Sequence, residues 1–452
     1  MLLMKILVLI DGEHYPPVTR DTVLSIGPDV KAAVFMGGTE KIGSVKELTD
    51  YIALPLYSTK TRSITDIINC IVTACEKHDI QQVIDLSDEP VVDYAARFCI
   101  ASVLMKEDIQ YKGSDFCFTP PHLYDVLSKP SMMVIGTAKR VGKTAISGYI
   151  ARTLKSNGYT PCIVTMGRGG PAEPEIVRGD KIELTPSYLV KQADAGKHAA
   201  SDHWENALTS RVITVGCRRC GGGMAGAPFT SNTVEGAITA NDLDTDFVIM
   251  EGSGITLPSV KTDTCVVVVG AHQSTESIEK YFGPFRILIA DLAIVMMCEE
   301  PMASPEKVET MEKVLDKIHP GIKQAHCVFR PIPLGSIKGR KVALVTTAPP
   351  AVLERNIVPY LEETYNCEIV GASPHLSNRP KVRKDLEHFL PAADLLLTEV
   401  KASSIDVATR EALNSGIEVV YMDNVPHLVG GTVKNVEKTL IQLAQLAQEV
   451  SL

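Results

Sequence analysis

The chain has 452 residues, which is too long for one hydrophobic core, so two to four domains are expected. Its formal net charge is -9 and no run of Lys or Arg stands out, which argues against nucleic acid as a partner. Eleven cysteines show no disulfide-like spacing, and the apolar run at residues 1–10 is too short to span a bilayer. We therefore expect a cytoplasmic protein with reduced thiols and no membrane contact.

The first block of the chain alternates apolar runs with helical patterns. It predicts strands at residues 5–10 and 82–85, and helices at residues 63–78 and 91–103. Such alternation favours a parallel sheet. Two prolines within residues 119–122 break the pattern, so an N-terminal α/β domain is predicted over residues 1–126.

The second block, predicted as a domain over residues 127–332, has the most hydrophobic strands. Their composition suits strands buried on both faces of a sheet. They are predicted at residues 132–135, 162–165, 247–250, 264–269 and 292–296. The polar, glycine-rich residues 167–232 interrupt the pattern and are predicted as a long loop, of the kind that is either functional or disordered.

The third block, predicted as a C-terminal α/β domain over residues 333–452, starts after two prolines in residues 331–333. Strands are predicted at residues 341–346, 395–398 and 418–422. The closing helix, at residues 432–450, has leucines and valines at helical spacing, which is typical of core packing.

A phosphate-binding loop is predicted at residues 136–144, between a strand and a helix at residues 145–154. Its glycines let backbone N–H groups point at phosphate oxygens, and the helix N-terminus adds positive potential. Lys143 would reach the β and γ phosphates of ATP, and the Thr144 hydroxyl would bind Mg²⁺. The predicted nucleotide-binding residues are Gly136, Thr137, Ala138, Lys139, Arg140, Val141, Gly142, Lys143, Thr144 and Ala145. The fold class is therefore α/β, with a central P-loop NTPase domain and a mostly parallel sheet between two α/β domains.

The first glycine of this loop lies one residue earlier than in the usual motif. Counting back from Gly142, the usual motif would place glycine at Thr137, whereas this chain has it at Gly136. The shifted form resembles the P-loop of dethiobiotin synthetase and related ATP-dependent ligases, in the branch that includes MinD-like ATPases. Lys139 and Arg140 inside the loop are either a solvated basic pair or additional cations directed at phosphate, and the second interpretation is favoured.

Two carboxylates are candidates for holding Mg²⁺. Glu251 ends an apolar strand and precedes two glycines in residues 252–254, at the edge where α/β sheets bind ligands. The segment resembles a Glu-Gly-Ala-Gly segment of dethiobiotin synthetase. Asp202, in the long polar stretch, would bind the metal, orient His203 or remain a solvated loop residue.

Two glycine-arginine segments indicate a second, anionic substrate, because the planar guanidinium binds phosphate or carboxylate in a fork. They contribute Arg168, Gly169 and Gly170, then Arg218 and Arg219. Surface turns are the alternative interpretation. Cys217 and Cys220 are too few for a zinc site and are more simply two incidental thiols than a redox pair.

In the first block, acidic turns follow two of the predicted strands, at residues 11–18 and 85–90. Both would lie at the carboxyl edge of one sheet, which is either a second ligand site or a pair of ordinary acidic turns.

Taken together, the motifs at residues 11–18, 136–145, 167–171, 251–254 and 268–273 resemble those of the cyclic 2,3-diphosphoglycerate synthetase family. The resemblance covers the first two blocks. It implies that ATP and 2,3-diphosphoglycerate give cyclic 2,3-diphosphoglycerate, ADP and phosphate. Lys143, Lys139, Arg140 and Glu251 would then be the catalytic residues, and Arg168, Arg218 and Arg219 would neutralise the substrate.

Two alternatives remain at this point. One is a dethiobiotin-synthetase-like ligase that activates a carboxylate or carbamate, although so many arginines favour a substrate with several phosphates. The other is a MinD-like regulatory ATPase, which typically has a lysine where this chain has Ala138. A homodimer is expected from the P-loop branch, and residues 297–301 are the positional candidate for contacting adenine.

Overall fold

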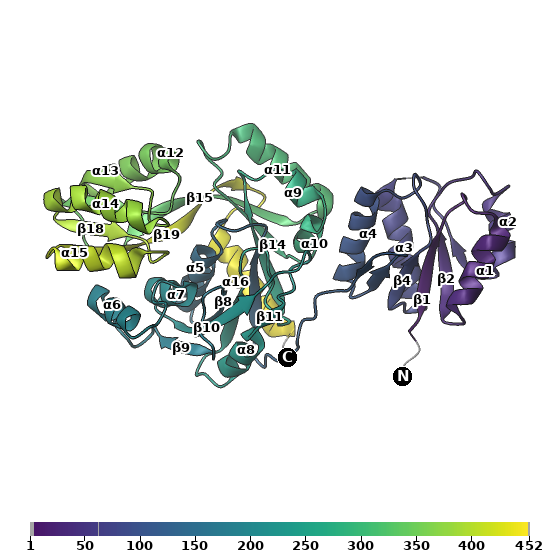
Figure 1. Ribbon diagram of the computed structural model, residues 1–452, viewed down its shortest axis with the longest axis horizontal. Coiled ribbons are helices and arrows are strands. Elements are labelled where there is room, and N and C mark those ends of the chain that lie inside the picture. The colour runs from purple at the N-terminus through teal and green to yellow at the C-terminus, as the bar shows by residue number, and fades with distance from the viewer. Residues whose placement is uncertain (1–3, 62, 451–452) are drawn as a thin grey trace. The chain divides into compact units, whose positions relative to one another are not determined.

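The computed structural model describes residues 4–61 and 63–450, so residues 1–3 of the apolar N-terminal run lie outside the described residues (Figure 1). The chain forms two compact units. The first comprises residues 1–121 with residues 276–289, and the second comprises residues 122–275 with residues 290–452. Within the described part of the chain, no helix is long and apolar enough to cross a membrane.

The first unit is built on one six-stranded sheet in the order β3-β2-β1-β4-β5-β6, parallel except for its last pair. The strands are β1 (Ile6–Ile10), β2 (Val30–Phe35), β3 (Leu56–Tyr57), β4 (Gln82–Asp85), β5 (Gln110–Lys112) and β6 (Cys117–Phe118). The helices are α1 (Pro16–Ile26), α2 (Val45–Ile52), α3 (Ile64–His78), α4 (Tyr94–Lys106), α9 (Glu276–Glu279) and α10 (Gly283–Leu288). Every residue of β1 is buried, as expected for a central strand.

The second unit begins with a P-loop lobe, whose parallel sheet runs in the order β10-β8-β12-β7-β13-β14-β15. Its strands are β7 (Ser131–Gly136), β8 (Pro161–Gly167), β9 (Glu175–Arg178), β10 (Ile213–Cys220), β11 (Thr230–Ser231), β12 (Phe247–Glu251), β13 (Thr264–Gly270), β14 (Leu292–Met296) and β15 (Lys323–Pro333). All residues of β7, β8, β12, β13 and β14 are buried. The predicted α/β fold, with a mostly parallel sheet whose strands are buried on both faces, is confirmed.

The C-terminal lobe continues the same sheet through an antiparallel pair between β15 and β19 (Glu418–Gly431) (Figure 1). Beyond β19 the order is β18 (Leu395–Thr398), β16 (Lys341–Val345) and β17 (Glu368–Ser373), all parallel. Its helices are α12 (Pro350–Val352), the π-helix η1 (Leu353–Ile357), α13 (Val358–Tyr365), α14 (Arg379–Phe389), η2 (Leu390–Ala392), the π-helix η3 (Ser404–Thr409) and α15 (Arg410–Asn414). Pro331 lies inside β15, and Pro333 is the last residue of that strand.

The prediction of a long loop at residues 167–232 is wrong. The segment contains β9, α6 (Pro186–Asp194), α7 (Asp202–Ser210), β10 and β11. Gly216 lies in β10. A β-carbon there would lie 2.6 Å from the His203 ring, so the glycine permits close packing of α7 on the sheet. The glycine suggested a loop, whereas it marks a strand that a helix approaches closely.

The last helix, α16 (Val436–Val450), returns to the P-loop lobe and packs against α5 (Lys143–Ser156), with which it lies side by side in Figure 1. Leu440 and Leu443 join Ile150 and Leu154 in one buried cluster. The remaining helices of this lobe are α8 (Thr233–Asn241) and α11 (Pro305–Ile318). The predicted leucine stripe is therefore core packing, and it packs the end of the chain against the helix that follows the phosphate loop.

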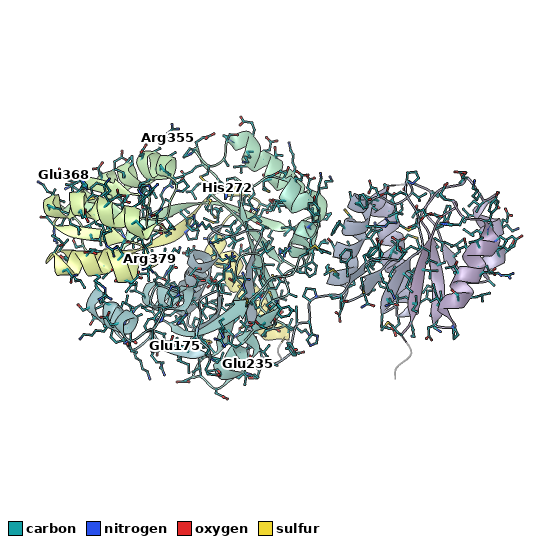
Figure 2. All side chains as sticks on the ribbon, viewed as in Figure 1. Glu175, Glu235, His272, Arg355, Glu368 and Arg379 are labelled. Atoms are coloured by element: carbon teal, nitrogen blue, oxygen red, sulfur yellow. The ribbon has the colours of Figure 1, made fainter. Side chains whose placement is uncertain are left out.

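A buried polar contact fixes α7 on the sheet and gives a pH prediction. Glu175 of β9, labelled in Figure 2, accepts from Lys197 Nζ at 2.6 Å, and its Oε2 lies 3.1 Å from His203 Nε2. The hydrogen bond from His203 is the main cause that lowers the pKa of Glu175 to about 2, with Lys197 adding to it. The stabilisation is therefore present above the unfolded pKa of about 4.5 and lost as the pH falls toward 2.

We expect Glu175→Gln to lower the free energy of unfolding by about 1–3 kcal/mol at pH 7. The difference from wild type should shrink at pH 3–4, because Glu175 in the unfolded chain is then largely protonated. Denaturant unfolding at the two pH values measures both numbers. Glu363→Gln, at an exposed position of α13, is the control; an equal loss at both pH values would contradict the ionic origin of the effect.

Candidate active site

The predicted phosphate loop opens onto a cavity of about 600 Å³ between the two lobes of the second unit. Its walls include the carboxyl ends of parallel strands from both lobes, which is the usual ligand-binding edge of α/β sheets. Charged lining residues are Lys139, Arg140, Lys143, Arg168, Asp202, Glu251, Glu299, Glu300, Glu399 and Lys401. Apolar lining residues are Met297, Met302, Phe329, Val352 and Ile357.

Within the loop, the backbone conformation depends on two glycines. Gly142 has φ +101° at the N-cap of α5, and a β-carbon on it would lie 2.4 Å from the Phe329 ring. A β-carbon on Gly136 would lie 2.9 Å from Lys143 Cδ and 3.0 Å from Nζ. The displaced glycine is therefore the residue that leaves room for the lysine side chain.

The lysine itself is buried, and its ammonium donates to the Ala138 carbonyl at 3.1 Å. Burial lowers the pKa of Lys143 to about 8, opposed by the negative charges of Glu251 and Asp202. Thr137 and Gln273 fix the loop from the other side, since the Thr137 hydroxyl donates to the Gln273 side-chain oxygen at 2.5 Å.

The carboxylate of Glu251 is buried at the end of β12 and is held by two donors. The Thr144 hydroxyl donates to Oε1 at 2.7 Å, and the Asn206 amide donates to Oε2 at 2.8 Å. Burial is the main cause that raises the pKa of Glu251 to about 7, and the charge of Asp202 adds to it. Glu251 is thus a buried acid next to a second carboxylate.

Helix α7 contributes side chains at the spacing i, i+3, i+4, which lie on one face of a helix. Asp202 lines the cavity, Glu205 pairs with Lys401 and Asn206 holds Glu251. His203 is oriented by Ser201 Oγ at 3.0 Å and by Glu175, instead of by Asp202 as one sequence alternative held. A loop prediction hid this spacing.

The hydroxyl of Thr144 and the carboxylates of Glu251 and Asp202 fit a hard divalent cation, which prefers oxygen ligands. The two acidic side chains are close enough for the charge of Asp202 to raise the pKa of Glu251. A bound cation would relieve that repulsion.

Of the glycine-arginine segments, the first lines the cavity with Gly167, Arg168 and Gly169. Gly170 instead packs on β10, because a β-carbon there would meet the Cys217 carbonyl at 2.0 Å. The Arg168 and Arg219 guanidinium groups converge on Gly254, at 2.8 and 3.6 Å from its ideal β-carbon.

Arg219 donates to the Ser253 carbonyl at 3.0 Å, while its buried Nε has no partner among the described residues. Burial, followed by the charge of Arg168, lowers the pKa of Arg219. Two guanidinium groups directed at the same glycine have the chemistry to bind an anion. Arg218 is exposed on β10, and neither Arg218 nor Arg219 is among the residues that line the cavity.

The two cysteines of this segment do not form a pair. Cys217 is buried and Cys220 is exposed, and both are free thiols. Residues three apart on a strand point to opposite faces of the sheet. Burial raises the pKa of the Cys217 thiol to about 12, and its sulfur packs beside Gly236, which agrees with the incidental interpretation.

The C-terminal lobe supplies the opposite wall, which sequence reasoning missed. Glu399 follows β18 and accepts from the hydroxyls of Thr346 and Thr347, each at 2.8 Å, and from the Asn424 amide at 3.1 Å. Two residues later, Lys401 Nζ lies 3.0 Å from Glu205 Oε1 of α7. These side chains follow strands without a recognisable motif, so only the fold brings them to the cavity.

The phosphate loop also reaches this lobe. Arg140, with φ +64°, donates to the Ser377 hydroxyl at 3.3 Å, and both residues line the cavity. Lys139 lines the cavity as well.

The apolar side of the cavity includes part of the segment predicted to contact adenine. Met297, Glu299 and Glu300 line it, together with Phe329. His272, labelled in Figure 2, also lines the cavity, and its buried Nδ1 has no hydrogen-bond partner among the described residues.

In the first unit, the two acidic turns do meet at one sheet edge, as predicted. The Asp88 backbone N–H donates to Asp11 at 2.7 Å, and His14 bridges Asp11 and Asp88 at 2.7 and 3.2 Å. These polar atoms satisfy one another, and the described residues contain no group of three or more His, Cys, Asp or Glu arranged for a metal. The two turns also line a cavity of about 290 Å³, so both a ligand site and ordinary turns stay open.

Comparison with known proteins assigns the chain to a family. Models of the N-terminal, P-loop and C-terminal domains of cyclic 2,3-diphosphoglycerate synthetase match residues 5–119, 131–328 and 333–425. Proteins named cyclic 2,3-diphosphoglycerate synthetase are 50% identical over 98% of this chain and 97% of the relative in Methanothermus fervidus, and 51% identical over 97% and 98% in Thermococcus sibiricus. The relative in Rubrobacter xylanophilus is 47% identical over 98% of both chains.

Among solved structures, that of LpxK from Aquifex aeolicus in complex with ATP is 13% identical, covers 78% of this chain and 96% of its own, and has a TM-score of 0.44. That likeness is too distant to carry an argument, so the assignment depends on the sequence relatives and the three domain models. The resemblance seen in the motifs is confirmed, and it extends to the C-terminal block, where no motif was recognised: the chain belongs to the cyclic 2,3-diphosphoglycerate synthetase family.

Proposed function

We propose that the protein uses ATP to close an intramolecular phosphoanhydride in 2,3-diphosphoglycerate, giving cyclic 2,3-diphosphoglycerate, ADP and phosphate. The observation that carries the proposal is one cavity lined by both the P-loop lysine Lys143 and the separate cations Arg168 and Lys401, in a chain of this family. A P-loop that bound only ATP would need cations only for the phosphates of ATP. The additional cations suit a second ligand that bears phosphate.

The proposed reaction has two steps. The terminal phosphoryl group of ATP moves to one phosphate of the substrate, and ADP leaves. An oxygen of the other substrate phosphate then attacks the phosphorus of that activated substrate phosphate. The bond to the transferred group breaks, inorganic phosphate leaves, and the new P–O–P bridge closes the ring.

In this proposal, residues 136–145 bind the phosphates of ATP, and the apolar wall around Met297 and Phe329 takes the adenine. Lys139 and Arg140 act with Lys143 in the phosphoryl transfer. Arg168 and Gly169 line the cavity and bind the acceptor, while Arg219, outside the lining, adds positive charge beside Arg168 at Gly254. Arg218 is a weaker candidate because its side chain lies outside the cavity.

Thr144, Glu251 and Asp202 would hold Mg²⁺, which supplies positive charge against the phosphate oxygens when it is bound. Asn206 and the Thr144 hydroxyl orient Glu251. The homodimer and the cytoplasmic location stay predictions. The ligase alternative on a carboxylate and the MinD-like switch are not favoured, because relatives about 50% identical along nearly the whole chain have the synthetase name.

Phosphorus NMR tests the reaction. Purified protein with ATP, Mg²⁺ and 2,3-diphosphoglycerate should give a cyclic pyrophosphate signal together with ADP and phosphate in equal amounts. EDTA should abolish the signal. Hydrolysis of ATP without a cyclic product, over a range of salts, would refute the substrate assignment.

Arg168→Ala should raise the KM for 2,3-diphosphoglycerate by about 10- to 100-fold or abolish turnover, because one charge-assisted phosphate contact is lost. The Kd for ATP should change less than threefold. Arg218→Ala, outside the cavity, is the matched control and should have the smaller effect. Unchanged kinetics in Arg168→Ala would remove Arg168 from the site.

Gly136→Ala should weaken ATP binding by about tenfold or more, because its β-carbon would lie within 3.0 Å of the Lys143 ammonium and displace it. Calorimetric titration with ATP measures the loss. Gly335→Ala is the control, since a β-carbon there meets nothing closer than 3.4 Å. Equal ATP affinity of both variants and wild type would show that the shifted glycine has no part in binding.

A further inference from the structure

We infer that Lys401 is a substrate contact supplied by the C-terminal lobe, and that its ammonium binds the substrate phosphate that is not being phosphorylated by ATP. The inference rests on the proposed function and assigns a role to the lobe whose contribution the motifs left open. Lys401 follows β18 and lines the cavity opposite the phosphate loop, where Lys143 and Arg168 lie.

The first observation is that the Lys401 ammonium has unused donors. An ammonium has three N–H groups. Within the described part of the chain, the contact of Nζ is the ion pair with Glu205 Oε1 at 3.0 Å. The side chain retains 29% of its exposure and lines the cavity.

The second observation is that its surroundings keep this ammonium charged. Burial opposes the charged form of Lys401, but the charges of Glu205, Glu399 and Asp202 outweigh it and raise the pKa of Lys401. Burial also raises the pKa of Glu205, to about 8, so Glu205 is the weaker anion of the pair and Glu399 supports the charge on Lys401. Glu399 does not depend on Lys401, because Thr346, Thr347 and Asn424 already donate to its carboxylate. Lys401 therefore stays a cation even before an anion binds.

The third observation is the distribution of charge over the walls. Among the described residues that line the cavity, the C-terminal lobe contributes one cation, Lys401, and the other four come from the P-loop lobe: Lys139, Arg140, Lys143 and Arg168. The four cations of the P-loop lobe lie on the wall that also binds the phosphates of ATP. A cation on the opposite wall can neutralise it and hold the two phosphates in position for ring closure.

A purely structural ion pair is the competing explanation. A buried ion pair adds little to the free energy of unfolding, because the cost of desolvating the two charges offsets their attraction. The Glu205 carboxylate is itself incompletely satisfied, since its buried Oε2 has no hydrogen-bond partner among the described residues. Glu205 positions the lysine, and an experiment must separate this effect from the direct contact.

The test uses Lys401→Met and the double variant Lys401→Met/Glu205→Gln, which leaves no unpaired buried charge. Calorimetry measures binding of 2,3-diphosphoglycerate and of 3-phosphoglycerate in the presence of Mg²⁺ and a non-hydrolysable ATP analogue. Wild type should bind the diphosphate more tightly than the monophosphate. We expect both variants to lose about 10- to 100-fold in affinity for the diphosphate and at most threefold for the monophosphate.

Lys401→Arg should restore most of the loss because it keeps the charge, and Lys338→Met, at an exposed lysine of the same lobe, should bind like wild type. Restored diphosphate binding in the double variant would show that Lys401 acts only through Glu205 and would overturn the inference. An equal loss for both ligands would do the same. Failure of wild type to form the cyclic product would refute the proposed function, while this binding difference would still decide the role of Lys401.

Discussion

The buried carboxylate of Glu251 is the constraint on which the rest of the site depends. A carboxylate with 1% exposure is costly unless hydrogen bonds or a cation compensate it. Here Thr144, the residue after the P-loop lysine, holds one oxygen, and Asn206 of α7 holds the other. The carboxylate therefore ties the phosphate loop to a helix that lies more than fifty residues further along the chain, and any ligand cation would enter an arrangement that already exists.

The second requirement is the continuous sheet. Because β15 and β19 pair along nearly their whole shared length, from Ala325 to Pro333, the carboxyl ends of β16 and β18 face the cavity rather than belonging to a separate module. Arg152 of α5 reinforces the junction with an ion pair to the buried Asp423 of β19 at 2.6 Å. The position of Lys401 relative to Lys143 is thus set by backbone hydrogen bonds, which suits a site that must hold two phosphates at a defined separation.

Local signals sufficed for part of this arrangement and failed for the rest. The apolar runs of β7, β12, β13 and β14 and the glycines of the phosphate loop are contiguous in sequence, so they predict both the fold class and the loop. β10 was missed because Gly216, required for contact with His203, resembles a loop residue. The i, i+3, i+4 spacing on α7 was detectable but lay inside that supposed loop. Glu399 and Lys401 carry no local pattern, because only the pairing of distant strands brings them to the cavity.

The charged side chains of the site repel one another in the absence of ligands, and a bound ligand would reduce this repulsion. Burial lowers the pKa of Lys143 to about 8, and burial together with the charge of Arg168 lowers the pKa of Arg219, so these cations raise the free energy of the ligand-free protein. Glu251, with its raised pKa, is the corresponding acid. Phosphate groups and a divalent cation would relieve both kinds of repulsion at once. Binding energy would then come from charges that the fold already holds in place, which is the arrangement expected of a site that stabilises phosphoryl transfer through preorganised electrostatics.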